Sequence, residues 1–307
     1  MSDAPIDFRA FPKQFLISPE GAPPPPTRGG HADAAAGWRV QAAPAVPLIP
    51  VEGPEGGRLG LLIGWPILRG RLWRRGETLR LAPGETVETA IPPELAGRAV
   101  LLWRADEGPR LETDAGGFLP AVWSAEAGLV ASTSTLVDLA APRGVDAEAA
   151  EIFAFPRRRG FLPFGLTHHV GVRRLLPGHR LDLDAMAATR VWPDPARLAA
   201  PPLEGDAADA ALRAAAERAA AQVGAVAAAA DPPRLYLSGG RDSRMTLAAL
   251  VAALGPRIGE LVCETLVNAA ALDLHLARQA AAAAGARHLA VPVRPSSREE
   301  VAAWLRR

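Results

Sequence analysis

One stretch of the sequence decides the fold of the second half of the chain: Arg234-Leu-Tyr-Leu-Ser-Gly-Gly-Arg-Asp-Ser-Arg-Met-Thr-Leu-Ala-Ala-Leu-Val-Ala-Ala-Leu254. The apolar run Leu235-Tyr236-Leu237 favours a short buried strand. After a polar loop, apolar residues recur at helical spacing from Met245 to Leu254, and Gly255-Pro256 ends the helix. The pattern therefore predicts a strand, a glycine loop over Ser238–Ser243, and a helix.

The residues of this glycine loop suit a phosphate group. Gly239 and Gly240 let the backbone approach a ligand closely, and the N–H groups that open the following helix attract an anion. Ser238 and Ser243 add hydroxyl donors, and Asp242 is suited to hold a divalent cation against phosphate oxygens. The alternative is a turn that needs glycine only for its backbone freedom. The complete pattern between a strand and a helix favours the phosphate site.

Composition limits the classes of function. The chain has 307 residues, of which 49% are hydrophobic, so it is long enough for one large or two ordinary domains. A formal net charge of +1 gives no reason to expect nucleic acid or an anionic membrane surface as a partner. Cys263 is the single cysteine, which excludes a disulfide framework. Neither a signal peptide nor an apolar run of membrane-spanning length is visible, so we expect a cytoplasmic protein.

The sequence predicts three parts. Residues 1–57 are rich in proline and glycine, and we interpret them as a flexible or polyproline II leader. Residues 58–205 contain short apolar runs separated by Gly, Pro or Asp, which indicates a β-rich domain. Residues 206–307 hold the glycine loop. In this third part the expected elements are a helix over Asp206–Ala230, strands over Leu235–Leu237, Ile258–Thr265 and His288–Val293, a helix over Leu272–Ala284, and a last helix opened by a capping box at Ser296 and Ser297.

Three further segments carry a family resemblance. Thr167…Gly171-Val172…Leu175-Leu-Pro-Gly-His179…Leu181-Asp-Leu-Asp184 precedes the glycine loop, and Thr113–Trp123 lies upstream of it. Asp273…Ala277-Arg-Gln-Ala280…Ala284-Gly285…His288 follows the loop. With the loop, these segments resemble the glutamine-using asparagine synthetases, which belong to the PP-loop ATP pyrophosphatase superfamily. The resemblance covers about residues 95–307.

The resemblance implies an α/β fold. A degenerate, β-rich class II amidotransferase-like domain would be followed by a partial Rossmann-like parallel α/β domain that binds ATP. The implied activity is that of an AMP-forming amide ligase of the asparagine synthase type, in which ATP adenylates a carboxylate substrate and an amine then displaces AMP. ATP and Mg²⁺ are the implied cofactors.

The family pattern also implies roles for individual residues. Ser238, Gly239, Gly240 and Ser243 would bind the pyrophosphate oxygens of ATP, and Asp242 would be the magnesium ligand. Arg241 belongs to the same loop but stands where the family has an aliphatic residue. Backbone groups along Val262–Thr265, beginning with Val262 and Cys263, would bind the adenine. The residue that performs catalysis is not identifiable from the sequence.

Other parts of the family pattern are missing. Its glutaminase needs an amino-terminal cysteine, whereas this chain begins Met1-Ser2, so we expect no glutaminase activity. Lys13 is the only lysine, and no second glycine- and acid-rich loop follows residue 293. We therefore expect an incomplete synthetase domain, with the strand Leu235–Leu237 on an open sheet edge and a second polypeptide completing the crevice.

Two alternatives to the ligase remain open. The chain could be a non-catalytic homologue that binds nucleotide or a partner protein, which the missing lysine favours. Thiolation of tRNA uses the same kind of loop, but it normally requires further cysteines and a basic surface. His168 and His169 are adjacent, so on a strand their side chains would point to opposite faces, which is poor geometry for one metal ion.

Overall fold

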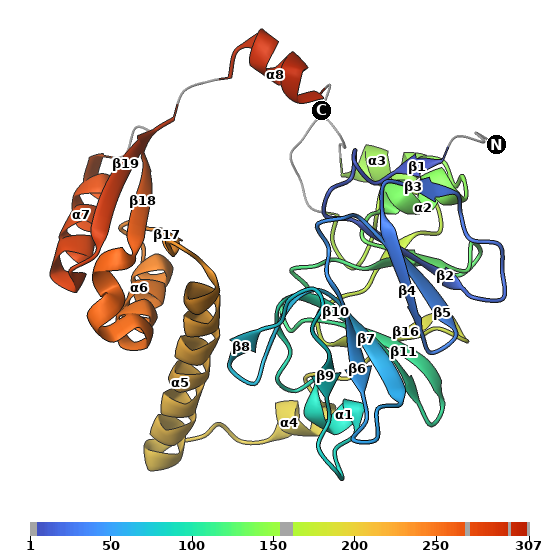
Figure 1. Ribbon diagram of the computed structural model, residues 1–307, viewed down its shortest axis with the longest axis horizontal. Helices are drawn as coiled ribbons and strands as arrows, with labels where there is room; N and C mark the ends of the chain where they lie inside the picture. Colours follow the sequence, from blue (N-terminus) through green and yellow to red (C-terminus); the bar gives the residue numbers. More distant parts are fainter. Residues whose placement is uncertain (1–4, 154–161, 268–270, 294–295, 306–307) are drawn as a thin grey trace. The chain divides into compact units, whose positions relative to one another are not determined.

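A computed structural model describes residues 5–153, 162–267, 271–293 and 296–305 (Figure 1). The protein is mixed α/β and contains several sheets. Its chain divides into two compact units, of which the first comprises Met1–Leu68 and Trp73–Ala200. The second unit comprises Arg69–Leu72 and Pro201–Arg307. Each unit is described by itself below.

Two large sheets form the first unit. One is antiparallel throughout and has the strand order β14 (Arg173–Arg174), β12 (Val122–Ser124), β13 (Leu129–Ala131), β2 (Phe15–Pro19), β5 (Trp38–Ala42) and β4 (His31–Ala35). The other follows the path β16 (Ala187–Arg190), β15 (His179–Asp182), β11 (Gly108–Thr113), β10 (Ala96–Ala105), β7 (Arg58–Leu68), β6 (Leu48–Glu52) and β9 (Leu79–Arg80). The remaining elements of this unit are β1 (Ile6–Asp7), β3 (Thr27–Arg28), α1 (Val87–Ala90), α2 (Ser134–Ala140), α3 (Ala147–Ile152) and α4 (Pro195–Ala199), while β8 (Arg71–Leu72) belongs to the second unit.

Strand β10 contributes to two separate cores. Val100 and Leu102 belong to a large buried cluster that also contains Phe15, Ile17 and Val40 from the other sheet. Leu101 and Trp103, which alternate with them along the strand, belong to a second buried cluster on the opposite face. Both faces of this strand are therefore covered, which explains its nearly continuous apolar sequence.

The prediction of a leader over residues 1–57 is wrong. Strands β1 to β6 lie within this segment, and its apolar residues, such as Phe15 and Val40, are completely buried. Most of the prolines occur at strand ends and in the connections between strands, with Pro19 closing β2 and Pro23–Pro26 lying in the loop that precedes β3, whereas Pro50 lies within β6. Proline is tolerated at such positions because they need no ladder hydrogen bond from its nitrogen. The proline-rich segment is therefore part of the first unit's core.

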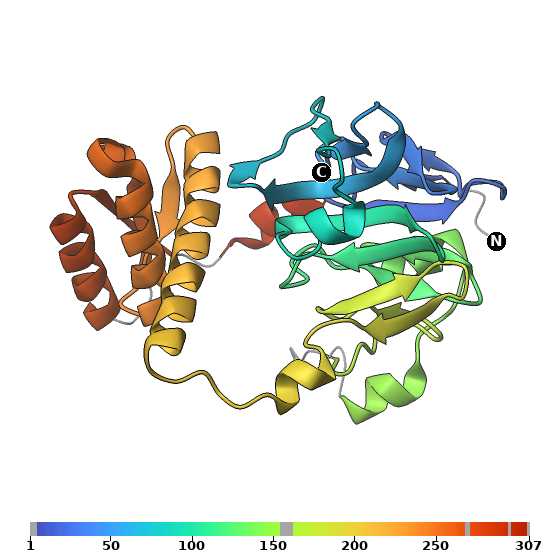
Figure 2. The ribbon, with the colours of Figure 1, turned by 90° about the horizontal axis from the view of Figure 1, so that it is seen from below.

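The second unit contains a parallel three-stranded sheet in the order β17 (Arg234–Tyr236), β18 (Val262–Val267) and β19 (Arg287–Pro292). Helix α5 (Gly205–Ala229) precedes the sheet and packs beside α6 (Arg241–Leu254), as Figure 2 shows. The other elements are the 3₁₀ helix η1 (Gly255–Glu260), α7 (Ala271–Ala284) and α8 (Arg298–Leu305). The expected alternation of strands and helices is confirmed. A capping box also opens α8, through Ser297 and Glu300.

Strand β17 lies at the edge of this sheet. In the described part of the chain it pairs with β18 on one side only, as expected for the strand that precedes the glycine loop. Leu237 is nevertheless buried, because its side chain joins a core with Leu247, Leu250 and Cys263. Tyr236, whose side chain alternates with that of Leu237, is 70% exposed. Only one face of the edge strand is therefore covered.

None of the helices in the described residues is long and apolar enough to cross a membrane. The longest, α5, is alanine-rich and also carries charged residues such as Asp209, Arg213 and Glu217 along its length.

The burial of the amino-terminal segment leads to a test of stability. Phe15→Ala should lower the free energy of unfolding by about 3–5 kcal/mol, because it removes a completely buried ring and leaves a cavity. Phe118→Ala is the matched control, since that ring is 67% exposed. Urea unfolding of both variants measures the difference. Equal stability of the two variants would contradict the placement of β2 in the core.

Candidate functional site

The glycine loop Ser238–Ser243 connects β17 to α6 at the carboxyl end of the parallel sheet. Two hydrogen bonds fix the point where the loop begins. The Leu237 N–H donates to the Glu264 carbonyl at 2.8 Å, and the Thr265 hydroxyl donates to the Leu237 carbonyl at 2.7 Å. The backbone that leads into the loop is therefore held by the neighbouring strand. In open parallel sheets, ligands bind at this end of the strands.

The two serines of the loop bind each other. Their hydroxyl oxygens are 3.0 Å apart, the Ser238 N–H donates to Ser243 Oγ at 3.1 Å, and Ser243 Oγ donates to the Ser238 carbonyl at 3.1 Å. The Gly240 N–H donates to Ser238 Oγ at 3.1 Å. These bonds close the loop on itself, so its shape is preorganised without a ligand. One consequence is that both hydroxyls would have to exchange partners to reach a phosphate.

A carboxylate from another element reaches into the loop. The Gly239 N–H donates to Asp273 Oδ1 at 2.7 Å, and Asp273 lies in the first turn of α7. A Cβ on Gly239 would lie 2.7 Å from this oxygen and 3.0 Å from Leu276 Cδ1. Glycine is therefore required here for space, not for an unusual backbone angle. The loop thus already binds one anionic group, the Asp273 carboxylate, through a backbone N–H.

The amino end of α6 offers further donors. Gly240 is its N-cap residue and provides no side-chain cap. Asp242 is exposed in the first turn, and within the described residues no hydrogen bond or ion pair engages its carboxylate. Arg241 is exposed beside it, and Arg244 Nε donates to the Gly240 carbonyl at 3.2 Å. Arg241 and Arg244 add positive charge at the positive end of the helix dipole, and the Asp242 carboxylate in the same turn offsets part of it. A bound anion would offset the rest.

Val262 and Cys263, expected to bind adenine, do not lie at the loop. They stand at the amino end of β18, opposite Arg234 and Leu235 in the register, and both are buried. Their backbones pair with both neighbouring strands, which leaves no free group for a base. Burial raises the pKa of the Cys263 thiol to about 11, as expected for a core residue. The β18 residues nearest the loop are instead Thr265–Val267, at the carboxyl end of the strand.

The sequence did not identify Asp273 and His288 as parts of this site, and it gave Thr265 only a backbone role. His288 Nε2 lies 2.9 Å from Thr265 Oγ1, whose proton already goes to the Leu237 carbonyl. His288 must therefore donate to Thr265. Burial lowers the pKa of His288, and the charge of Arg278 adds to this effect. A polar residue at the carboxyl end of the second strand is the signal that could have indicated Thr265.

The described residues contain no group of three or more His, Cys, Asp and Glu side chains that could hold a metal ion. A cation at the loop would therefore depend on Asp242 and on oxygens supplied by a ligand. Mg²⁺ is commonly bound in this way, through one or two carboxylates together with substrate phosphates.

Comparisons of the sequence with known proteins assign no function. Neither a protein-family model nor a curated protein matches the chain. What the glycine loop binds must therefore be inferred from its own residues and contacts.

The space around Gly239 leads to a second test. Gly239→Ala should destabilise the second unit by about 1–3 kcal/mol, because the new methyl group would overlap the Asp273 carboxylate and Leu276. Gly259→Ala is the matched control, since a Cβ there would meet nothing within 4 Å. Thermal unfolding followed by circular dichroism compares the two. A Gly239→Ala protein as stable as its control would show that the Asp273 contact is not formed.

Proposed function

We propose that the glycine loop binds ATP with Mg²⁺, and that the chain is the nucleotide-binding part of an AMP-forming amide ligase. The observation that supports this proposal is the loop's position. It lies at the carboxyl end of a parallel strand and leads into a helix whose first turn has no side-chain cap. Helix amino ends of this kind bind phosphate groups through backbone N–H groups and the helix dipole.

The donor set fits a polyphosphate. The first-turn N–H groups of α6 would bind phosphate oxygens, and the hydroxyls of Ser238 and Ser243 could add two further bonds. Arg241 and Arg244 would supply positive charge. Asp242 would hold Mg²⁺ against the same oxygens, since its carboxylate is exposed in the first turn.

Asp273 sets a condition on this binding. Its carboxylate accepts the Gly239 N–H, which is one of the donors that a phosphate would otherwise use. A phosphate close to Gly239 must therefore displace Asp273 or be separated from it by a cation. This contact favours the magnesium complex of a nucleotide over the free nucleotide, because like charges repel in a partly buried site.

The ligase activity is proposed from the family resemblance together with the loop. When bound, ATP would supply the AMP group that activates a carboxylate for attack by an amine. The chain's own residues would hold the phosphates and the magnesium ion. A second polypeptide could pair with the free edge of β17 and provide the other wall of the crevice.

A non-catalytic nucleotide-binding protein is the second candidate. The sequence contains a single lysine, Lys13, which belongs to the first unit. The second unit itself therefore contributes no lysine that could stabilise the charge that develops when ATP is cleaved.

Nucleotide binding is tested by calorimetry. Wild-type protein should bind ATP more tightly in the presence of Mg²⁺, and Asp242→Asn should weaken this binding about tenfold or more, since the variant loses a charged cation ligand. Asp209→Asn, an exposed carboxylate on α5, is the matched control and should behave like wild type. If Asp242→Asn binds Mg²⁺–ATP as tightly as the control, the role of Asp242 is disproved.

Catalysis is tested by exchange of labelled pyrophosphate into ATP in the presence of carboxylic acids such as aspartate and glutamate. We expect ATP binding without exchange by this chain alone, because β17 is unpaired on one side within the described residues and the second unit contains no lysine. Robust exchange by a monomer would contradict this expectation. It would show that an arginine such as Arg241 or Arg244 supplies the catalytic charge.

A further inference from the structure

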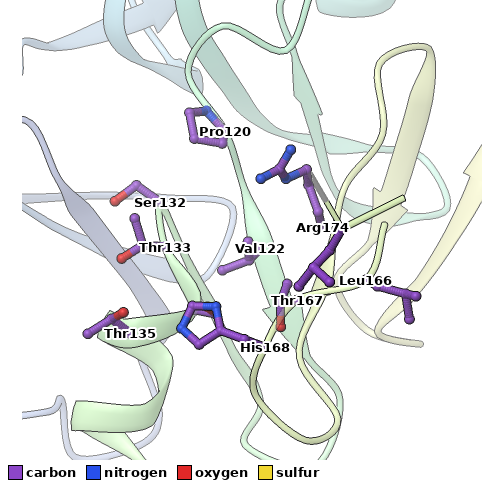
Figure 3. A pocket seen from close by; sticks show the side chains of 11 residues that line it. Pro120, Val122, Ser132, Thr133, Thr135, Leu166, Thr167, His168 and Arg174 are labelled. Carbon is purple, nitrogen blue, oxygen red and sulfur yellow. The ribbon is translucent and has the colours of Figure 1, made fainter. Parts of the chain in front are cut away.

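The first unit contains a pocket that the proposed function does not use. It is a cavity of about 290 Å³, close to the lower limit for sites that bind small molecules. Its walls come from β12, β14, the start of α2 and the segment around Thr167. Figure 3 shows Arg174 on one side of the cavity and Thr133 and Thr135 on the other, with Val122 between them.

Arg174 is the only cation with a permanent charge among the lining residues that the structure describes. Its guanidinium is directed into the pocket (Figure 3), and among the described residues no carboxylate pairs with it. Some other arginines of the unit are paired, as Arg110 is with Asp182 and Arg180 with Glu112. No acidic residue occurs in the described lining either. The pocket therefore has a positive charge without a counterion.

The backbone of Arg174 is held firmly. Its N–H donates to the Gly165 carbonyl at 2.8 Å, and β14 pairs with β12 so that Arg174 faces Val122 in the register. Arg173, the preceding residue, points to the opposite face of the strand. The strand that carries this cation is therefore rigid, while the Arg174 side chain itself is exposed.

The hydroxyl groups of the lining differ in their availability. Ser132 Oγ accepts the Phe15 N–H at 3.0 Å and donates to Gln14 Oε1, and Thr167 Oγ1 donates to the Val172 carbonyl at 2.8 Å. Thr133 caps α2. By contrast, the hydroxyls of Ser134 and Thr135 have no hydrogen-bond partner in the part of the chain that the structure describes. They remain available to a ligand.

The remaining lining limits the ligand's charge and shape. His168 lies beside His169, with ring centroids 4.2 Å apart, so the expectation that these side chains point to opposite faces is wrong. The two residues follow a turn in which the His169 N–H donates to Thr167 Oγ1, and they lie outside the named strands.

The charge of the pocket depends on His168 as well as on Arg174. Burial, and the neighbouring His169, lower the pKa of His168. The described lining thus carries about one positive charge at neutral pH. Pro120, Val122 and Leu166 provide apolar surface.

We propose that this pocket binds a small organic monoanion, a carboxylate attached to a short apolar group. The carboxylate would accept two parallel hydrogen bonds from the Arg174 guanidinium, a geometry that a planar carboxylate matches. The apolar group would lie on Val122 and Leu166, and the hydroxyls of Ser134 and Thr135 would bind any further polar atom. A doubly charged phosphate is disfavoured because the described lining supplies a single permanent cation.

Saturation-transfer NMR on the full chain tests the proposal with butyrate and with its neutral isostere butyramide. Inorganic phosphate is the third probe, and its affinity is measured by how well it displaces bound butyrate. Butyrate should bind in the millimolar range, and butyramide should bind about tenfold more weakly, because it lacks the charge that pairs with arginine. Arg174→Gln should weaken butyrate binding by a similar factor. Arg173→Gln is the matched control and should leave it unchanged.

Three results would overturn the proposal: no saturation transfer to butyrate, equal butyrate binding by the two arginine variants, or phosphate binding tighter than butyrate binding. Thermal unfolding shows whether Arg174→Gln is folded. If it is not, Thr135→Val takes its place, because this side chain is exposed at the start of α2. Thr135→Val should weaken the binding of 3-hydroxybutyrate more than the binding of butyrate, because valine cannot form a hydrogen bond with the extra hydroxyl of 3-hydroxybutyrate. An equal effect on both acids would also count against the proposal.

Discussion

The parallel pairing of β17 with β18 is the constraint on which the candidate site depends. This pairing sets the register between the end of β17 and the neighbouring β18, and it brings Thr265 within hydrogen-bonding distance of the Leu237 carbonyl. The connection from β18 to β19 then passes through α7, whose first turn delivers Asp273 to the Gly239 N–H. The loop is therefore shaped from two directions by elements that the same sheet holds in place.

The local parts of this arrangement could be predicted from the sequence. The strand, loop and helix around Ser238–Ser243 follow from a change of apolar spacing and two glycines, and the capping box at Ser297 from a serine three residues before a glutamate. The open edge at β17 also agrees with the expectation. All of these depend on residues close together in the sequence or on the order of elements.

The long-range parts could not be predicted. Asp273 lies 34 residues beyond Gly239, and nothing in the sequence marks it as a loop ligand. The amino-terminal segment was misjudged for a similar reason. Its prolines suggested an extended leader, whereas Phe15 is buried because its strand pairs with the strand before Ser132, more than a hundred residues later. Val262 and Cys263, the expected adenine contacts, lie at the amino end of β18 and not beside the loop, because the residue that reaches the loop depends on strand length and so on tertiary pairing.

The position of β10 between two cores has a consequence for how the first unit loses its structure. Leu101 and Leu102 are adjacent residues, yet each belongs to a different buried layer. A displacement of the strand caused on one side is transmitted through the backbone to the packing on the other. Effects of substitutions in the two layers therefore should not add, and neither layer is expected to open while the other stays intact. The first unit is thus a single cooperative block, although its apolar residues form two clusters.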